Sequence, residues 1–215
     1  MKIGVLGTGT VGTTIATKLV ELGHEVKLGS RTADNPKSAE WAKGAGAKAS
    51  QGTFADAAAF GEIVFNCTKG EVALAVLDAA GASNLARKIL VDVTNPLDAS
   101  KGMPPSLSVC NTDSLAEQIQ RALPETKVVK TLNTVNASVM VNPSLVKGAH
   151  DMFVSGNDAA SRGKVSEILT GWFGWKNVVD LGDLTGARAQ EMIVVLWVRL
   201  YMAFQSPTFG LHVTR

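Results

Sequence analysis

Short apolar runs alternate along this chain with segments in which apolar residues recur three and four positions apart. The first run, residues 2–6, precedes such a segment at residues 10–22, and the order repeats as far as residue 132. The short runs predict strands, and the periodic segments predict amphipathic helices. The predicted strands are residues 2–6, 25–28, 47–49, 62–66, 88–93 and 127–132, and the predicted helices are residues 10–22, 38–44, 53–60, 71–80 and 114–123.

This alternation of strand and helix favours a parallel sheet that is covered by helices on both faces. The pattern changes slightly after Pro143, where strands are predicted at residues 151–155 and 177–181 and helices at residues 158–170 and 185–204. This segment is too short for an independent catalytic domain, so we expect it to extend the sheet and add a capping helix. The predicted fold class is α/β, a doubly wound parallel sheet with a small C-terminal α/β extension that ends in a long apolar helix.

A glycine motif of the form G-x-G-x-x-G stands between the first predicted strand and the first predicted helix. In that setting, Gly7 permits a tight turn, Gly9 lets the backbone approach a pyrophosphate, and Gly12 allows helix and strand to pack closely. The helix N-terminus then offers free N–H groups to phosphates. We therefore predict a dinucleotide site on a Rossmann-type sheet, against the alternative of a simple glycine-rich turn. The predicted loop residues are Gly7, Thr8, Gly9, Thr10, Val11 and Gly12.

The end of the second predicted strand indicates which dinucleotide binds. A site for NAD usually carries an acidic residue there, on the ribose 2′-hydroxyl. This chain has Ser30, Arg31 and Thr32 instead, and a planar guanidinium suits a phosphate because it can bond two oxygens. We predict NADP(H) rather than NAD(H); the alternative is that Arg31 is a solvated loop charge.

Further site residues are expected beyond the carboxyl ends of the later strands, where open parallel sheets bind ligands. Their small polar side chains can bond the nicotinamide carboxamide and ribose without adding charge to the path of a hydride. Lys69 could contact the pyrophosphate or the acceptor. For each residue, the alternative is a turn position with no ligand. The predicted residues of this group are Cys67, Thr68, Lys69, Asn95, Asn133, Val135, Asn136 and Ala137.

Composition excludes several classes of function. A net charge of +2 gives no reason to expect a nucleic acid or an anionic membrane as partner. Cys67 and Cys110 show neither metal-ligand spacing nor a disulfide framework, which fits a reducing, cytoplasmic setting. The apolar segment at residues 192–204 carries Arg199 and is too short to span a membrane, so a buried or interface helix is expected.

Acid–base machinery is missing from the sequence. Tyr201 is the single tyrosine and is followed four residues later by Gln205, so the Tyr-x-x-x-Lys pair of short-chain dehydrogenases is absent. Cys67 has no partner base nearby in sequence, and we expect it to be inert. We predict no catalytic side chain and no metal. Alcohol oxidation needs a group that takes a proton, so the pattern favours a flavin-like acceptor ring that manages its own protons.

Two other functions stay open. A non-catalytic NADPH-sensing or regulatory protein would also lack an acid–base residue. An imine or keto reductase would need an acid donor, which the sequence does not reveal.

Six motifs are spread along nearly the whole chain: residues 7–12, Gly-His-Glu-Val at 23–26, Gly-Ser-Arg at 29–31, Val-Asp-Val-Thr-Asn-Pro at 91–96, Lys-Thr-Leu-Asn-Thr-Val-Asn-Ala at 130–137, and Asp-Leu-Gly at 180–182 with Ala187 and Arg188. Together these motifs resemble the NADP oxidoreductase, coenzyme F420-dependent family, a pattern shared by the cytosolic domains of STEAP-type metalloreductases.

The resemblance implies hydride transfer between NADP(H) and a small-molecule redox acceptor, coenzyme F420 or a flavin. It implies that residues 8–11 bind the pyrophosphate, that Ser30 and Arg31 bind the 2′-phosphate, and that Thr68, Val135 and Ala137 border the nicotinamide. Residues 1–142 would form the NADP-binding domain. Residues 143–215 would complete the acceptor site and supply a homodimer contact through the C-terminal helix.

Two positions depart from the family pattern. Lys69 and Asn136 stand where deazaflavin-dependent members tend to have proline. Both positions lie where the acceptor should dock, so they bear on the acceptor and leave the NADP(H) prediction unchanged.

Overall fold

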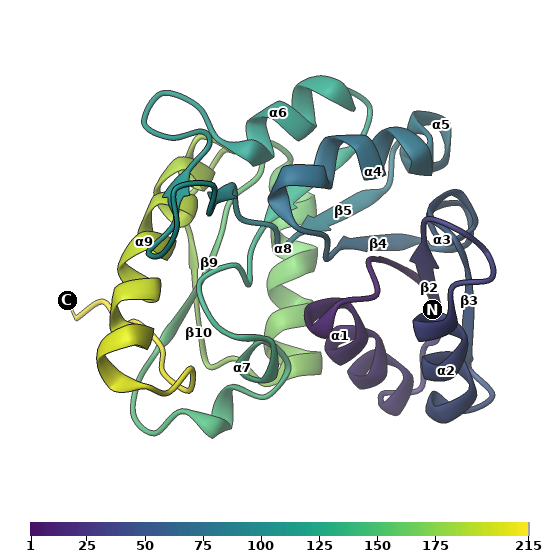
Figure 1. The fold of residues 1–215 in the computed structure, drawn as a ribbon, viewed down its shortest axis with the longest axis horizontal. Helices are drawn as coiled ribbons and strands as arrows, with labels where there is room; N and C mark the ends of the chain where they lie inside the picture. The colour runs from purple at the N-terminus through teal and green to yellow at the C-terminus, as the bar shows by residue number, and fades with distance from the viewer. Residues whose placement is uncertain (215) are drawn as a thin grey trace.

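The computed structural model describes residues 1–214 and has an α/β fold built on one large parallel sheet (Figure 1). Its strand order is β3-β2-β1-β4-β5-β8, which is the Rossmann order, and the predicted fold class is confirmed. The strands are β1 (Lys2–Leu6), β2 (Glu25–Ser30), β3 (Ala49–Thr53), β4 (Ile63–Asn66), β5 (Ile89–Asp92) and β8 (Lys127–Lys130).

Helices cover both faces of this sheet. Neighbouring residues in a strand point to opposite faces, and Val64 and Phe65 of β4 accordingly belong to two different hydrophobic clusters. One cluster includes Ile15 and Leu19 of α1, and the other includes Leu77 of α4. The helices around the sheet are α1 (Thr10–Glu21), α2 (Pro36–Ala45), α3 (Phe54–Phe60), η1 (Gly70–Val72), α4 (Ala73–Ala80), α5 (Ala82–Leu85) and α6 (Leu115–Ala122).

Some short elements were not expected from the sequence. Two strands of two residues each, β6 (Leu97–Asp98) and β7 (Ser106–Leu107), pair between the predicted strand at residues 88–93 and the predicted helix at residues 114–123. A single helical turn, α7 (Ala137–Val141), and a 3₁₀ turn, η2 (Pro143–Leu145), follow β8. Elements of two to five residues are too short to show a period, so pattern analysis misses them.

The C-terminal segment differs from the expected extension of the sheet. Two strands, β9 (Asp151–Val154) and β10 (Asn177–Asp180), form a separate parallel pair. One isolated antiparallel bridge, between Lys130 and Ser155, joins this pair to the end of β8. The expectation that this segment extends the sheet was therefore wrong, because within residues 1–214 this antiparallel bridge is the only β-bridge between β8 and the C-terminal strands. The helices here are α8 (Ala159–Ile168), the π-helical turn η3 (Leu169–Phe173) and α9 (Gly186–Phe204).

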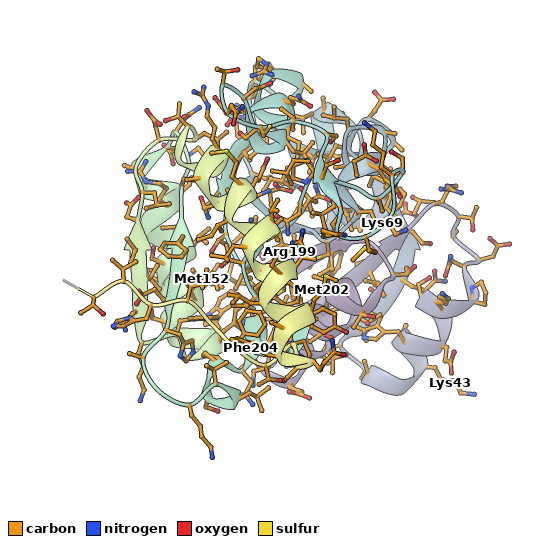
Figure 2. The ribbon with its side chains drawn as sticks, turned by 60° about the vertical axis from the view of Figure 1, so that its left-hand side comes forward. Lys43, Lys69, Met152, Arg199, Met202 and Phe204 are labelled. Carbon is orange, nitrogen blue, oxygen red and sulfur yellow. The ribbon has the colours of Figure 1, made fainter. Side chains whose placement is uncertain are left out.

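The long final helix predicted at residues 185–204 is present as α9. Gln190, Glu191 and Val194 are buried on its inner face. Leu196 and Phe204 are exposed on its outer side, and Figure 2 shows α9 across the front of the molecule with Phe204 near one end. The helix is thus buried on one face only within the single chain. Among residues 1–214, none of the helices has the length and apolarity that crossing a bilayer requires.

Candidate active site

The glycine loop, residues 7–12, has the close contacts that its motif requires. Gly7 adopts a positive φ of 112°. A Cβ atom on Gly12 would lie 1.9 Å from the Gly7 carbonyl oxygen, so a side chain there cannot fit without movement of the backbone. A Cβ on Gly9 would have no neighbouring atom of residues 1–214 within 4 Å. The loop is therefore tightly packed at Gly7 and Gly12 and open at Gly9.

The N-terminus of α1 fits a phosphate group. Gly9 is its N-cap residue and supplies no side-chain hydrogen bond to the first turn. The first N–H groups of a helix lack partners within the helix, and they carry the positive end of its dipole. A bound pyrophosphate would find donors here together with the open face at Gly9.

Ser30, Arg31 and Thr32, at the end of β2 and directly after it, differ in their exposure to solvent. The backbone N–H of Gly7 donates to the carbonyl of Gly29 at 3.0 Å, which holds the end of β2 beside the glycine loop. Ser30 is buried, and its hydroxyl donates to the carbonyl of Thr32 at 2.5 Å. Arg31 and Thr32 are exposed. The predicted trio therefore offers Arg31 and Thr32 to a ligand, whereas the Ser30 hydroxyl stabilises the turn.

A cavity of about 410 Å³ opens where the later strands end. It brings together the loops after β4, β5 and β8, as expected for ligand sites on such sheets. Arg31 and the outer part of the glycine loop do not line it. Its lining residues are Val11, Cys67, Thr68, Lys69, Gly70, Glu71, Val93, Thr94, Asn95, Leu97, Ala99, Asn133, Val135, Asn136, Ala137 and Met140.

Asn95 and Asn133 lock two of these loops together. The Asn95 amide donates to the Asn133 carbonyl at 2.9 Å, and the Asn133 amide donates to Asn95 Oδ1 at 2.9 Å. Asn133 also donates to the carbonyl of Gln190 in α9 at 2.7 Å. Within residues 1–214, the buried Asn133 Oδ1 has no hydrogen-bond partner. A ligand in the cavity could supply the missing donor.

The two positions that depart from the family pattern differ in their contacts. Asn136 is the N-cap of α7, where Oδ1 accepts from Val139 N at 3.0 Å, and its amide donates to the Pro207 carbonyl at 2.9 Å. Its polar atoms are thus engaged in the fold. Lys69 is exposed at the rim of the cavity and lies 3.6 Å from Glu71.

The Cys67 thiol is poorly suited to act as a nucleophile. Burial, and then the charge of Asp92, raise the pKa of this thiol well above its ordinary value. Thiolates are the reactive form, so this environment disfavours the reactive form of Cys67. No cluster of three or more potential metal ligands occurs among the described residues 1–214.

Four buried polar residues behind the cavity were not predicted as site residues. Asp92 and Lys130 end β5 and β8, and their side chains lie 2.8 Å apart. Gln190 and Glu191 of α9 bond to the same strand end: the Gln190 amide donates to the Lys130 carbonyl at 3.3 Å, and Lys130 Nζ lies 2.9 Å from Glu191 Oε1. A sequence signal existed, since Asp92 and Lys130 interrupt runs of Ile, Leu and Val.

Comparisons with known proteins agree with this geometry. A family model described as NADP oxidoreductase coenzyme F420-dependent matches residues 2–96. A crystal structure from Arthrobacter sp. FB24, of a protein assigned as an F420-dependent NADP reductase, is 51% identical in sequence and superposes over 100% of both chains with a TM-score of 0.94.

Two curated proteins are also similar. The F420-dependent NADP reductase of Methanothermobacter marburgensis is 28% identical over 225 residues, which cover 100% of this chain and 98% of that protein. Metalloreductase STEAP3 of Rattus norvegicus is 30% identical over 209 residues, which cover 96% of this chain and 38% of that protein. This chain therefore spans well under half the length of the rat relative.

Proposed function

This chain belongs to the NADP oxidoreductase coenzyme F420-dependent family and is an NADP-dependent oxidoreductase; we propose that it transfers a hydride between NADP(H) and a deazaflavin or flavin-type ring. The acceptor is a small molecule that docks in the 410 Å³ cavity beside the nicotinamide.

The dinucleotide spans the two parts of the site. Its pyrophosphate lies at the N-terminus of α1, against the open face of Gly9. Its 2′-phosphate meets the exposed guanidinium of Arg31. Its nicotinamide enters the cavity, where Thr68, Asn95 and Asn133 offer neutral hydrogen-bonding groups.

The chemistry of the cavity wall carries the proposal for the acceptor. Among residues 1–214, no histidine, tyrosine or aspartate lines the cavity, and the ionisable groups of the lining are Cys67, Lys69 and Glu71. The raised pKa of Cys67, owing first to burial, keeps that thiol protonated, and Lys69 and Glu71 are exposed. A wall without a positioned acid or base favours an acceptor whose own ring stabilises the added hydride and exchanges its proton with water.

A panel of acceptors tests the proposal. The protein is mixed with NADPH and with F420, FMN, riboflavin or a ferric chelate, and the loss of nicotinamide absorbance is followed. We expect turnover with F420 or a flavin, and slower turnover by Arg31→Ala at low NADPH concentration. Turnover with the ferric chelate alone would overturn the choice of acceptor. Binding of NADPH without turnover across the panel would favour a sensing or regulatory protein.

We further propose that two copies associate through α9. Its outer side exposes apolar side chains at Leu196 and Phe204, which a partner copy would remove from water. Size-exclusion chromatography with light scattering should give a dimer for the native chain and a monomer for Leu196→Glu. Leu22→Glu is the matched control, because Leu22 is also exposed but lies after α1. A monomeric native chain would contradict the proposal.

A further inference from the structure

A row of polar side chains crosses the carboxyl ends of three adjacent strands. Asn66, Asp92 and Lys130 are the last residues of β4, β5 and β8, and they are direct neighbours in the sheet register. All three are fully buried. Asn66 Nδ2 donates to Asp92 Oδ1 at 3.0 Å, and Lys130 Nζ donates to Asp92 Oδ2 at 2.8 Å. The row lies directly behind the cavity, because Thr68 and Thr94 follow its strands and line the cavity.

Charge leaves this row only one arrangement of donors and acceptors. A carboxylate can only accept hydrogen bonds, and an ammonium group can only donate them. Asp92 therefore requires the NH₂ side of the Asn66 amide, which turns Asn66 Oδ1 away from it. The Thr68 hydroxyl lies 2.8 Å from that oxygen and must donate its hydrogen to it.

We call these linked hydrogen bonds, from Lys130 through Asp92 and Asn66 to Thr68, the relay. The direction of the Thr68 hydroxyl follows from it. Its single hydrogen is used on Asn66, so only lone pairs remain for a molecule in the cavity. The Thr94 hydroxyl is bound in the same way, since it donates to Asp92 at 2.9 Å. Thr68 is half-buried, whereas Thr94 is almost fully buried. Thr68 is therefore the hydroxyl that a ligand can reach.

Stability alone does not account for the buried charges. Lys130 Nζ also lies 2.9 Å from Glu191 Oε1, and Glu191 accepts from the backbone N–H groups of Leu115 and Ala116 at the start of α6. Burial lowers the pKa of Lys130, but Asp92 and Glu191 raise it by more, so its pKa lies above the ordinary value. Buried ion pairs of this kind stabilise a fold no better than apolar side chains of similar volume.

We propose that Asp92 and Lys130 are positioning residues that hold the Thr68 hydroxyl as a pure hydrogen-bond acceptor for the N–H₂ group of the nicotinamide carboxamide. This inference rests on the proposed placement of the nicotinamide in the cavity. It assigns the recognition of one ligand group to a charge pair that the ligand does not touch.

An analogue of the cofactor isolates this hydrogen bond. In 3-acetylpyridine adenine dinucleotide phosphate, a methyl group replaces the carboxamide NH₂, and the rest of NADP⁺ is kept. Calorimetry on the full chain gives the ratio of the two dissociation constants. In Thr68→Val, which keeps the shape of the side chain, the preference for NADP⁺ should fall by roughly 5- to 100-fold relative to the native chain.

Substitution of Asp92 tests the relay itself. In Asp92→Asn, the new amide oxygen stays on Lys130 and the new NH₂ faces Asn66. The Asn66 amide must then turn over and donate to Thr68, whose hydrogen swings into the cavity and opposes the carboxamide NH₂. The preference for NADP⁺ should fall as in Thr68→Val, whereas a general loss of structure would weaken both ligands equally. Asp113→Asn, on the surface beside Arg121, is the matched control and should keep the native ratio.

Asn66→Ala provides a second test if Asp92→Asn does not fold, because it cuts the relay and leaves the charge pair in place. A native ratio in Thr68→Val would overturn the inference while the proposed function stands. A native ratio in Asp92→Asn or Asn66→Ala, with a lowered ratio in Thr68→Val, would overturn the role of the charge pair. If the native chain binds neither dinucleotide, the proposed function fails and this inference fails with it.

Discussion

The glycine loop at one end of the candidate site presents only backbone groups, whereas the cavity at the other end is supported by buried polar side chains. At the loop, Gly9 leaves an open face and an uncapped helix N-terminus. At the cavity, Asp92 and Lys130 are fully buried behind the wall, and both bond to Thr94, which lines it. The first end has the backbone donors that suit a phosphate group, whereas the second end fixes the orientation of individual side chains.

This contrast explains why one end is easier to recognise than the other. A backbone site needs small residues at fixed spacing within a single turn, which is a local pattern. The cavity end joins residues that are 26 and 38 positions apart, because neighbouring strands in a parallel sheet are separated by crossover helices. No local spacing records such pairs.

The largest effect should come from removing the charge behind the cavity. Lys130→Met leaves the carboxylates of Asp92 and Glu191 buried without their partner, which should lower the free energy of unfolding by about 3–5 kcal/mol. The raised pKa of Lys130 means that its contribution is fully present below the unfolded value of about 10.4 and is lost only as pH rises through the folded value. Urea denaturation at neutral pH measures the difference.

Lys127→Met is the matched control for this prediction. Lys127 lies on the same strand as Lys130 and forms an exposed pair, at 3.6 Å, with Asp158 at the start of α8. Exposed pairs contribute little to stability, so the loss in Lys127→Met should be small beside that in Lys130→Met. Equal losses of unfolding free energy in the two variants would show that the buried charge of Lys130 contributes no more to stability than an exposed one.

Two glycine-to-alanine substitutions separate the packing role of the glycine loop from its proposed binding role. Gly12→Ala places a Cβ 1.9 Å from the Gly7 carbonyl oxygen and should lower stability by about 3 kcal/mol. Gly9→Ala meets no described atom within 4 Å, so its cost should stay below about 1 kcal/mol, but its methyl group enters the space proposed for the pyrophosphate. Thermal unfolding and NADPH titration separate the two effects. Undiminished NADPH affinity in Gly9→Ala would contradict the placement of the pyrophosphate.

Particular residues show how far the sequence reaches. The parallel sheet with helices on both faces follows from the alternation of strand and helix, and Gly7 and Gly12 are as tightly packed as their spacing predicts. Ser30 has the expected position, but its hydroxyl turns inward to Thr32, because the orientation of a side chain depends on the turn around it.

The C-terminal strands show the limit of pattern analysis. Their positions at β9 and β10 were predicted, yet their pairing with each other rather than with β8 was not. Periodicity reports which residues are buried, and it does not report which neighbour a strand bonds. The roles of Gln190 and Glu191 were missed for the same reason, since both act on residues about 60 positions or more away.

The preference for NADPH over NADH tests whether a side chain near the glycine loop, that of Arg31, contributes to dinucleotide binding. Arg31→Ala should weaken NADPH binding by about 1–3 kcal/mol, the range for a charged hydrogen bond, and should affect NADH little. Fluorescence titration with each dinucleotide gives the two affinities. Lys43→Ala removes another exposed cation, on α2, and should change neither. Equal losses of NADPH and NADH affinity in Arg31→Ala would contradict the 2′-phosphate assignment.

The smallest effect is expected at Asn136, which lines the cavity but whose side-chain oxygen and nitrogen both form hydrogen bonds within the protein. Asn136→Ser keeps an oxygen to cap α7 and loses only the bond to the Pro207 carbonyl, so stability should fall by less than about 1 kcal/mol. Asn136→Ala removes the cap as well and should cost about 1 kcal/mol more. Because neither bond involves the dinucleotide, NADPH affinity should stay at the native level in both variants. A large rise in the KM for the acceptor in Asn136→Ser, at unchanged stability, would instead show that this amide contacts the acceptor ring.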